Sequence, residues 1–176
     1  GVSYLTADAN ARVSPLDDGT LAFTGTSDVT ILDFVWKWAK NGNPRDKSLV
    51  VLGEYLRRDE DGSVTADTVA NGVQTSAYSG RQDGFYVQGV YQFRPRWRVG
   101  ARYDRLDATN TLTLGTPTPL ATPGAPKRVS AMVDFSNSEF SRLRFQVSSD
   151  DSRVESDDQV FVQYLMSLGA HGAHRF

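Results

Sequence analysis

Cysteine is absent from the 176 residues, and histidine and methionine occur only twice each. Without a thiol, the chain can form neither a disulfide nor a cysteine nucleophile. Long apolar runs are missing as well, and none approaches the roughly 20 residues that a membrane-spanning helix needs. The net charge of -2 comes from 19 basic and 21 acidic residues. The basic excess expected of a dedicated nucleic-acid binder is therefore lacking, which argues against that class of partner.

Patterns typical of enzymes are also missing. Neither His171 nor His174 has a serine or cysteine nucleophile motif beside it, and no glycine-rich loop stands between a strand and a helix. The two histidines are three apart on an expected strand, so they point to opposite faces and make a poor zinc pair. The sequence predicts no enzyme, no cofactor and no metal site.

An acidic stretch near the C-terminus is the remaining candidate for cation binding. Its carboxylates could gather a divalent cation, because hard cations prefer carboxylate oxygens. The spacing lacks the Asp-x-Asp-x-Asp-Gly pattern of a calcium loop, which favours a solvated charged loop instead. The residues are Asp150, Asp151, Glu155, Asp157 and Asp158.

The last stretch, residues 159–176, alternates between apolar and polar positions. Every second residue from Val160 to Ala170, and then Phe176, is apolar, with Gly172 and His174 as interruptions. A period of two predicts a strand with one apolar face, and this one exceeds the usual five or six residues. It resembles the C-terminal signature of Gram-negative outer-membrane barrels. That resemblance implies that Phe176 is an assembly signal read by the barrel-assembly machinery. The edge strand of a soluble β-sandwich is the alternative.

Seven further segments alternate in the same way, which predicts about eight strands in all. Residues 1–14 form a weak first strand, because their apolar face fades after Tyr4. Six stronger strands are expected at 28–38, 49–58, 85–93, 97–104, 128–135 and 142–147.

The expected connections alternate between short and mostly longer ones. Short turns fall at 41–48, 94–96 and 136–140, and longer loops at 60–80, 108–126 and 148–158. Bacterial outer-membrane barrels have short periplasmic turns and longer outer loops. The sequence therefore predicts an all-β, antiparallel, up-and-down transmembrane β-barrel, with residues 1–176 in a single domain.

Aromatic residues gather at the two ends of the expected strands. Tyr91 and Phe135 lie with others beside the short turns, and Phe85 lies toward the long loops. Amphipathic rings prefer the headgroup level of a bilayer, so two aromatic belts are predicted, against the alternative that the rings cap the core of a soluble sheet. The belt residues are Trp36, Trp38, Phe93 and Trp97 at one end and Tyr55 and Tyr103 at the other.

Charged residues occupy the opposite face of the same strands. Rings of charge along a pore bias the solutes that cross it. In a narrow barrel the same side chains would instead pair with one another and fill the interior, so barrel size decides. The predicted lumen-lining residues are Lys37, Arg98, Arg102, Arg128, Arg142, Arg144, Asp33, Glu54, Asp104 and Asp134.

Four segments together resemble one family. DFVWKWAKNGNPRDKS, GFYVQGVYQFRPRWRVGARYDRLD, FSNSEFSRLRFQ and QYLMSLGAHGAHRF are similar to the C-terminal half of proteobacterial outer-membrane barrels described as putative porins or zinc-regulated TonB-dependent receptors. The resemblance covers residues 27–176. It implies a cell outer-membrane location in a Gram-negative bacterium and contact with lipid and lipopolysaccharide, and it leaves room for an oligomer.

The patterns suggest the first two of the functions below, and the family resemblance implies the third. The first is a porin-like passive channel for small hydrophilic solutes, leaning toward anions because inward basic residues outnumber acidic ones. The second is a non-conducting structural or interaction barrel, and the third a fragment of a TonB-dependent receptor for a metal or chelate. Because residues 1–14 are a poor partner for the last strand, we expect the chain to be the C-terminal portion of a longer barrel.

Overall fold

The structure, a computed structural model, describes residues 1–167 except 17–18, 70, 115, 121–124 and 153–154. The described residues form one antiparallel sheet and a single 3-10 turn, Lys40–Gly42, which confirms the all-β prediction. The strands are β1 (Val2–Leu16), β2 (Gly19–Ala39), β3 (Ser48–Thr68), β4 (Gly72–Arg94), β5 (Trp97–Leu114), β6 (Thr116–Leu120), β7 (Lys127–Ser138), β8 (Ser141–Asp150) and β9 (Asp157–Met166).

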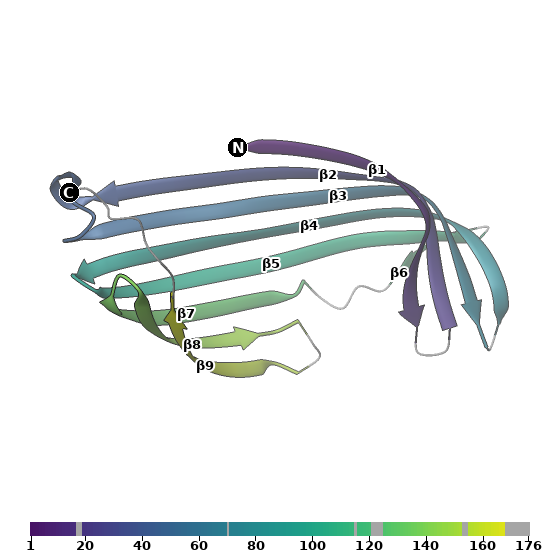
Figure 1. Cartoon of the computed structure of the whole chain (residues 1–176). Coiled ribbons are helices and arrows are strands. Elements are labelled where there is room, and N and C mark those ends of the chain that lie inside the picture. The colour runs from purple at the N-terminus through teal and green to yellow at the C-terminus, as the bar shows by residue number, and fades with distance from the viewer. Residues whose placement is uncertain (17–18, 70, 115, 121–124, 153–154, 168–176) are drawn as a thin grey trace.

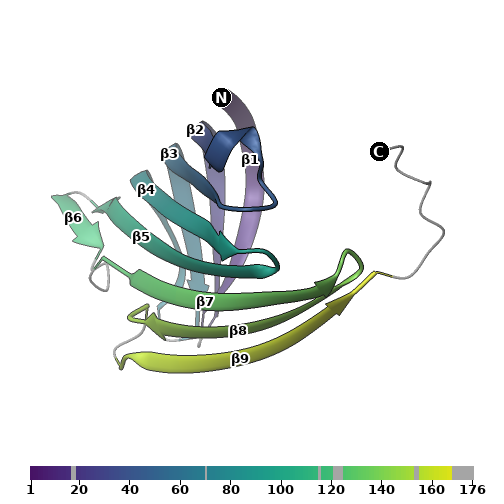
Figure 2. The same ribbon diagram turned by 90° about the vertical axis from the view of Figure 1, so that its left-hand side faces the viewer.

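Apart from β6, each strand pairs with the strands before and after it in the chain. The order is β1-β2-β3-β4-β5-β7-β8-β9, and the short β6 pairs with the far end of β5. The sheet curves like an open trough from β1 through β5 to β9 (Figure 1, Figure 2). Within the described residues β1 pairs with β2 and β9 with β8, so the sheet has two edges and is not closed into a barrel.

The two ends of the sheet differ, and the three short turns lie at one end as the sequence predicted. At one end, called here the short-turn end, β2–β3, β4–β5 and β7–β8 are joined through residues 40–47, 95–96 and 139–140. At the other, called the hairpin end, β1–β2, β3–β4 and β5–β6 project well beyond β7, β8 and β9 (Figure 1).

The loops predicted at 60–80 and 108–126 are wrong over much of their length. β3 continues to Thr68 and β4 begins at Gly72, with register pairs along the whole hairpin, and β5 runs on to Leu114. Likewise β2 begins at Gly19, earlier than expected. These segments are rich in Asp, Gly, Ser and Thr, so they carry no apolar period. Hydrogen bonding in a continuous ladder stabilises them as strands all the same.

Three neighbouring strands of the hairpin end are irregular at the same level. The register of β1 shifts between Ala9 and Arg12, and Ala11 has a φ of 53°. In β2 and β3, Gly25 pairs with Gly62, and a Cβ added to either would lie 2.7 Å from the Cα of the other. A bulge and bare glycines let backbones approach and bend, and the hairpins turn away from the rest of the sheet in Figure 1.

A small core stabilises the bent hairpins on their inner side. Phe23 and Val64 are only 4% and 5% exposed. The ring of Phe23 meets that of Tyr78 edge-on at 5.6 Å, and the guanidinium of Arg12 lies 4.9 Å above Phe23. Burial raises the pKa of Tyr78. The hairpin end is thus a packed structure with its own apolar contacts.

Candidate lipid-facing surface and concave polar face

Register sorts the side chains of the sheet onto two faces. Trp36, Val51, Gly89, Ala101, Ala131, Val147 and Val160 form one transverse row across seven strands. The row Asp33, Glu54, Tyr86, Asp104, Arg128, Asp150 and Asp157 belongs to the other face. Period-two alternation therefore predicted the division of side chains between the two faces of these strands, and the register adds which residues pair.

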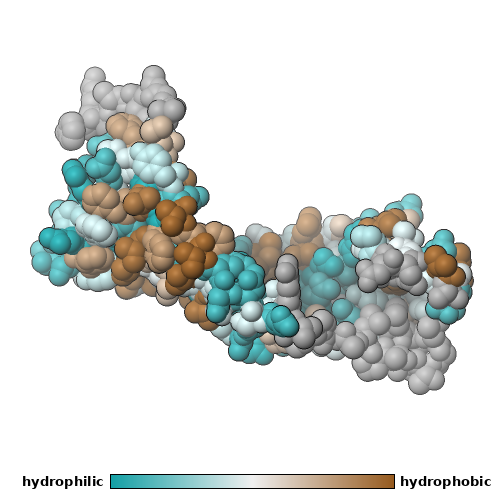
Figure 3. Space-filling view, turned by 90° about the horizontal axis from the view of Figure 1, so that it is seen from below, coloured by the Kyte–Doolittle hydropathy of each residue, from teal (hydrophilic) through white to brown (hydrophobic). Residues whose placement is uncertain are grey.

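The face that carries the first row is apolar from the short-turn end to about the middle of the long strands; this region is called the apolar band. Its side chains are well exposed, including Trp36 at 52%, Phe145 at 49% and Tyr164 at 61%. Brown side chains gather over β7–β9 on the underside of the trough, whereas teal ones appear toward the hairpins (Figure 3). A continuous exposed apolar surface of this kind marks contact with a partner or a membrane.

The apolar band ends at aromatic residues. Two of them are tyrosines that donate hydrogen bonds to aspartates of a charged zone. The hydroxyl of Tyr4 donates to Asp28 Oδ1 at 2.9 Å, and that of Tyr55 donates to Asp83. The rings of Phe85 and Tyr103 lie 5.9 Å apart at the same border. Tyrosine rings in an apolar layer with hydroxyls on its polar side are typical of a membrane interface.

Beyond this border the same face is charged. Arg57 Nε and Arg81 Nε lie 2.7 Å and 3.0 Å from Asp59, and Arg105 lies 3.8 Å from Asp107. The hydrogen bond from Arg57, followed by that from Arg81, holds the pKa of Asp59 below its usual value. The apolar face thus changes to a charged one within about two residues of the tyrosine border.

The predicted belt residues all lie on this face. Trp36, Trp38, Phe93 and Trp97 are near the short-turn end, where the ring of Trp97 packs 4.8 Å from Phe135. On β2 the apolar positions run from Thr30 to Trp38, nine residues or roughly 26 Å along the strand. Their contact with lipid stays a prediction.

The concave face brings the predicted arginines together, three of them around one carboxylate. Asp134 is fully buried. Arg144 Nε donates to its Oδ1 at 2.7 Å, Arg98 Nη2 donates to Oδ2 at 3.2 Å, and Arg142 Nη1 lies 3.5 Å from Oδ2. This group, called the Asp134 cluster, has three guanidinium groups for one carboxylate, and each of the three arginines stays about one-third exposed.

The two other predicted arginines are paired as well. Arg102 Nη2 lies 2.6 Å from Asp104 Oδ1, and its guanidinium stacks 3.8 Å from the ring centre of Tyr86. Arg128 lies 3.7 Å from Asp150 and donates to Gln159 Oε1 at 2.8 Å. Five arginines thus share three carboxylates. The arginines are therefore paired, which the sequence left open as the alternative to a charged pore lining. Within this group the positive charges still outnumber the negative ones.

Three predicted lumen residues lie on strands other than those that carry the arginines. Asp33 and Lys37 are on β2 and Glu54 is on β3, on the concave face. Asp33 pairs with Glu54 across the two strands, and Lys37 pairs with Val50. Glu54 also interacts with Tyr86, on whose ring Arg102 stacks. The concave face thus carries the five predicted arginines on β5, β7 and β8, and charges of both signs on β2 and β3.

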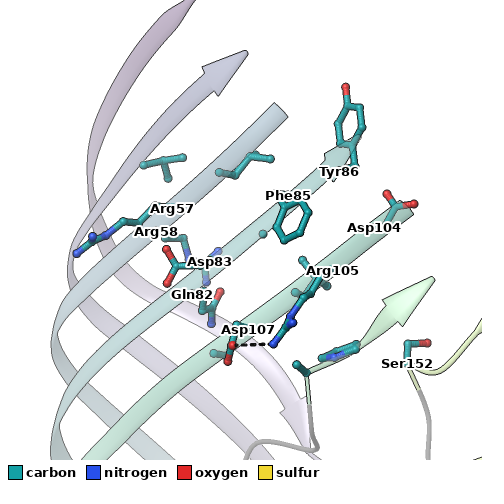
Figure 4. Close-up of a pocket in the computed structure, with 17 residues that line it drawn as sticks. Arg57, Arg58, Gln82, Asp83, Phe85, Tyr86, Asp104, Arg105, Asp107 and Ser152 are labelled. Carbon is teal, nitrogen blue, oxygen red and sulfur yellow. Dashed lines mark ion pairs between the residues drawn. The ribbon is translucent and has the colours of Figure 1, made fainter. Parts of the chain in front are cut away.

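A cavity of about 840 Å³ opens on the concave face, just inside the bend of the hairpins; it is called the hairpin cavity (Figure 4). Leu56, Gly84 and Leu106 lie side by side in the register and form its floor. Arg58 and Gln82 lie in the next row toward the hairpin tips, and Tyr86 and Asp104 in the next row toward the short-turn end. This site was not predicted, because the hairpins that border it include residues 60–80 and 108–126, which were expected to be loops.

The remaining predictions concern the terminal aromatic residue, the two histidines and the acidic stretch. Phe176, His171 and His174 are outside the described part of the chain. In the acidic stretch, Asp151 lies 3.3 Å from Lys127 Nζ. Among the described residues no group of three or more His, Cys, Asp or Glu side chains is placed to hold a metal ion. No described helix has the length and apolar character to cross a membrane.

Comparisons with known proteins add one relative. A protein of Aquifex aeolicus (strain VF5) described as an uncharacterized protein is 30% identical over 187 residues, which covers 100% of this chain and 36% of the relative. No family model matches the chain, and no solved structure matches it. The chain thus spans 36% of the length of the curated relative it matches, and that relative's description names no activity.

Proposed function

We propose that the sheet is part of the wall of an outer-membrane β-barrel that forms a porin-like passive channel for small hydrophilic solutes, with a preference for anions. The observation that carries this proposal is the division of side chains between two faces of the sheet. Seven strands, β2–β5 and β7–β9, expose an apolar band on the convex side, while the concave side carries charge. A transmembrane barrel needs an apolar outer band and tolerates a polar interior.

The two edges of the sheet support a barrel wider than this chain. Backbone groups left unpaired in hydrocarbon cost several kcal/mol each, so a sheet edge cannot stay open in lipid. Since β1 and β9 do not pair with each other in the described residues, further strands would close the wall between them. A relative of which this chain covers 36% has room for such strands.

Orientation and outer partners follow from the two ends. The short-turn end would face the periplasm and the hairpin end the exterior. The charged zone beyond Tyr4 and Tyr55 would then lie at headgroup level, against lipopolysaccharide. We keep the barrel-assembly machinery as a partner on the strength of the Phe176 resemblance alone.

The preference for anions is proposed from the Asp134 cluster. Three arginines surround one buried carboxylate and stay partly exposed on the concave face. Uncompensated positive charge along a pore attracts anions and repels cations.

Reversal potentials across a planar bilayer test this proposal with the full-length protein. In a potassium chloride gradient we expect open channels with chloride preferred over potassium. Arg98→Gln and Arg142→Gln should each lower that preference, because each removes a partly exposed positive charge while leaving Asp134 two arginines. The control is Arg81→Gln, in the charged zone of the convex face, which should change nothing.

A second candidate function, the non-conducting barrel, is favoured by one specific observation. All five predicted arginines are paired with carboxylates, as side chains that fill a narrow interior would be. Bilayers that contain folded protein and show no conductance would support this alternative and contradict the channel.

A further inference from the structure

The floor of the hairpin cavity is an apolar row. Leu56, Gly84 and Leu106 pair across β3–β5, and Val29 on β2 also lines the cavity. Leu56 and Leu106 are 37% and 58% exposed, although they lie on the face opposite the apolar band. Contact with lipid does not account for them, so the row is free to contact a ligand.

Gly84 shapes this floor. A Cβ at this position would lie 2.7 Å from Leu106 Cδ2, so the missing side chain lets Leu106 lie across the row. Gly84 lines the cavity beside Leu56, its register partner on β3. The volume of about 840 Å³ falls within the range of small-molecule sites.

An ion-pair group beside the cavity, toward the hairpin tips, has more guanidinium groups than carboxylates. Glu60 is 5% exposed and pairs with both Arg12, at 2.8 Å, and Arg58, at 3.2 Å. Ser27 also donates to it, at 3.1 Å. One buried carboxylate thus serves two guanidinium groups, and Arg58 is the one that lines the cavity.

Arg58 presents part of its guanidinium to the cavity. Its Nη2 donates to Glu60 and its Nε lies 3.2 Å from the same carboxylate, yet the side chain as a whole is 38% exposed and lines the cavity. A carboxylate that enters the cavity can therefore form a charge-assisted hydrogen bond with the exposed part of the guanidinium. At the opposite edge Arg102 and Asp104 pair with each other, so the Arg58 edge is the better place for an anion.

From these observations we propose that the hairpin cavity binds small organic carboxylates with an apolar or aromatic body. The body lies on Leu56, Gly84 and Leu106, and the carboxylate accepts hydrogen bonds from Arg58 and Gln82. The proposal deepens the channel function by naming a solute class, and it rests on the concave face being accessible to solutes. Binding can nevertheless be measured without any conductance.

Equilibrium binding to the full-length protein in lipid nanodiscs tests this proposal. Benzoate is the probe, benzyl alcohol has the body without the charge, acetate has the charge without the body, and empty nanodiscs correct for partition into lipid. We expect benzoate to bind at least about tenfold more tightly than either, because it alone makes the charged hydrogen bond and the apolar contact. Equal binding of benzoate and acetate, or no saturable binding of benzoate, overturns the proposal.

Variants separate the two parts of the site. Arg58→Gln should reduce benzoate affinity to that of benzyl alcohol, and it leaves Glu60 paired with Arg12. Leu106→Ala should weaken benzoate and benzyl alcohol alike, whereas Arg81→Gln, on the convex face, should change neither. If neither Arg58→Gln nor Leu106→Ala changes the affinity for benzoate, the proposed site is wrong.

The site and the channel can fail independently. A protein that binds benzoate but does not conduct would contradict the channel and support the site. A protein that conducts but does not bind benzoate would contradict the site and support the channel.

Discussion

Arginine placed at Val99 or Val133 is expected to lower the free energy of unfolding in lipid by about 2–4 kcal/mol. The two valines pair with each other on β5 and β7, in the middle of the apolar band, and are 37% and 39% exposed. In the proposed barrel each would face hydrocarbon near the bilayer midplane. A guanidinium there loses hydration without gaining a partner. Urea unfolding of the protein in liposomes measures the effect.

Gln146→Arg on the concave face is the matched control. Gln146 is half-buried, pairs with Met132 and Phe161 across the strands, and lies on the face that already carries arginine. Gly100 and Ser130 lie on the same face but are unsuitable, because a side chain at Gly100 would meet Met132 and Ser130 is buried against Ser148. Similar losses at Val99 and Gln146 would contradict the assignment of faces.

Asp134→Asn is expected to lower the free energy of unfolding by about 3–5 kcal/mol. The substitution keeps the size of the side chain but leaves Arg98, Arg142 and Arg144 without a carboxylate in a buried site. Three neighbouring cations then repel one another. The same unfolding assay, read at two salt concentrations, reports it. Higher salt should restore part of the loss by screening the repulsion.

Asp151→Asn provides the comparison for this prediction. Asp151 also forms an ion pair, with Lys127, but both side chains are well exposed. Exposed pairs contribute little, about 0–1 kcal/mol, so a small change is expected. Equal losses from Asp134→Asn and Asp151→Asn would show that the Asp134 cluster is no more than a surface network.

The fold was predictable where one face of a strand is apolar and the other polar. In residues 97–104, Trp97, Val99, Ala101 and Tyr103 alternate with Arg98, Arg102 and Asp104, and a one-residue slip would reverse both sets. The faces follow the pattern in each such strand. The three short turns were predicted where the alternation stops, and Asn-Gly and Pro mark the first of them.

The hairpin end could not be predicted by this pattern. In β3 the outward positions Asp59, Asp61, Ser63 and Thr65 are polar because they lie beyond the tyrosine border. The inward positions are mixed, with Glu60 and Val64 both buried. No period of two is left in hydropathy, and the segment therefore resembled a loop. The bend of these strands borders the hairpin cavity. Because the strands themselves were not predicted, the cavity could not be predicted either.

The ion pairs could not be predicted from the sequence either. Alternation placed Arg98, Arg142, Arg144 and Asp134 on one face, but only the register of β5, β7 and β8 shows that the three arginines meet at Asp134. Such contacts decide whether the arginines present free charge to a pore or are neutralised by carboxylates in a filled interior.

Spin-label accessibility along β5 tests the central claim most directly. The chain has no cysteine, so single cysteines can be introduced at each position from 97 to 104 and labelled in liposomes. We expect the odd positions to be accessible to oxygen and shielded from a water-soluble nickel complex, because they would face lipid. The even positions should show the weaker oxygen access of a polar or packed interior. Nickel access at Val99 and Ala101 equal to that of a soluble exposed strand would contradict a lipid-facing barrel wall.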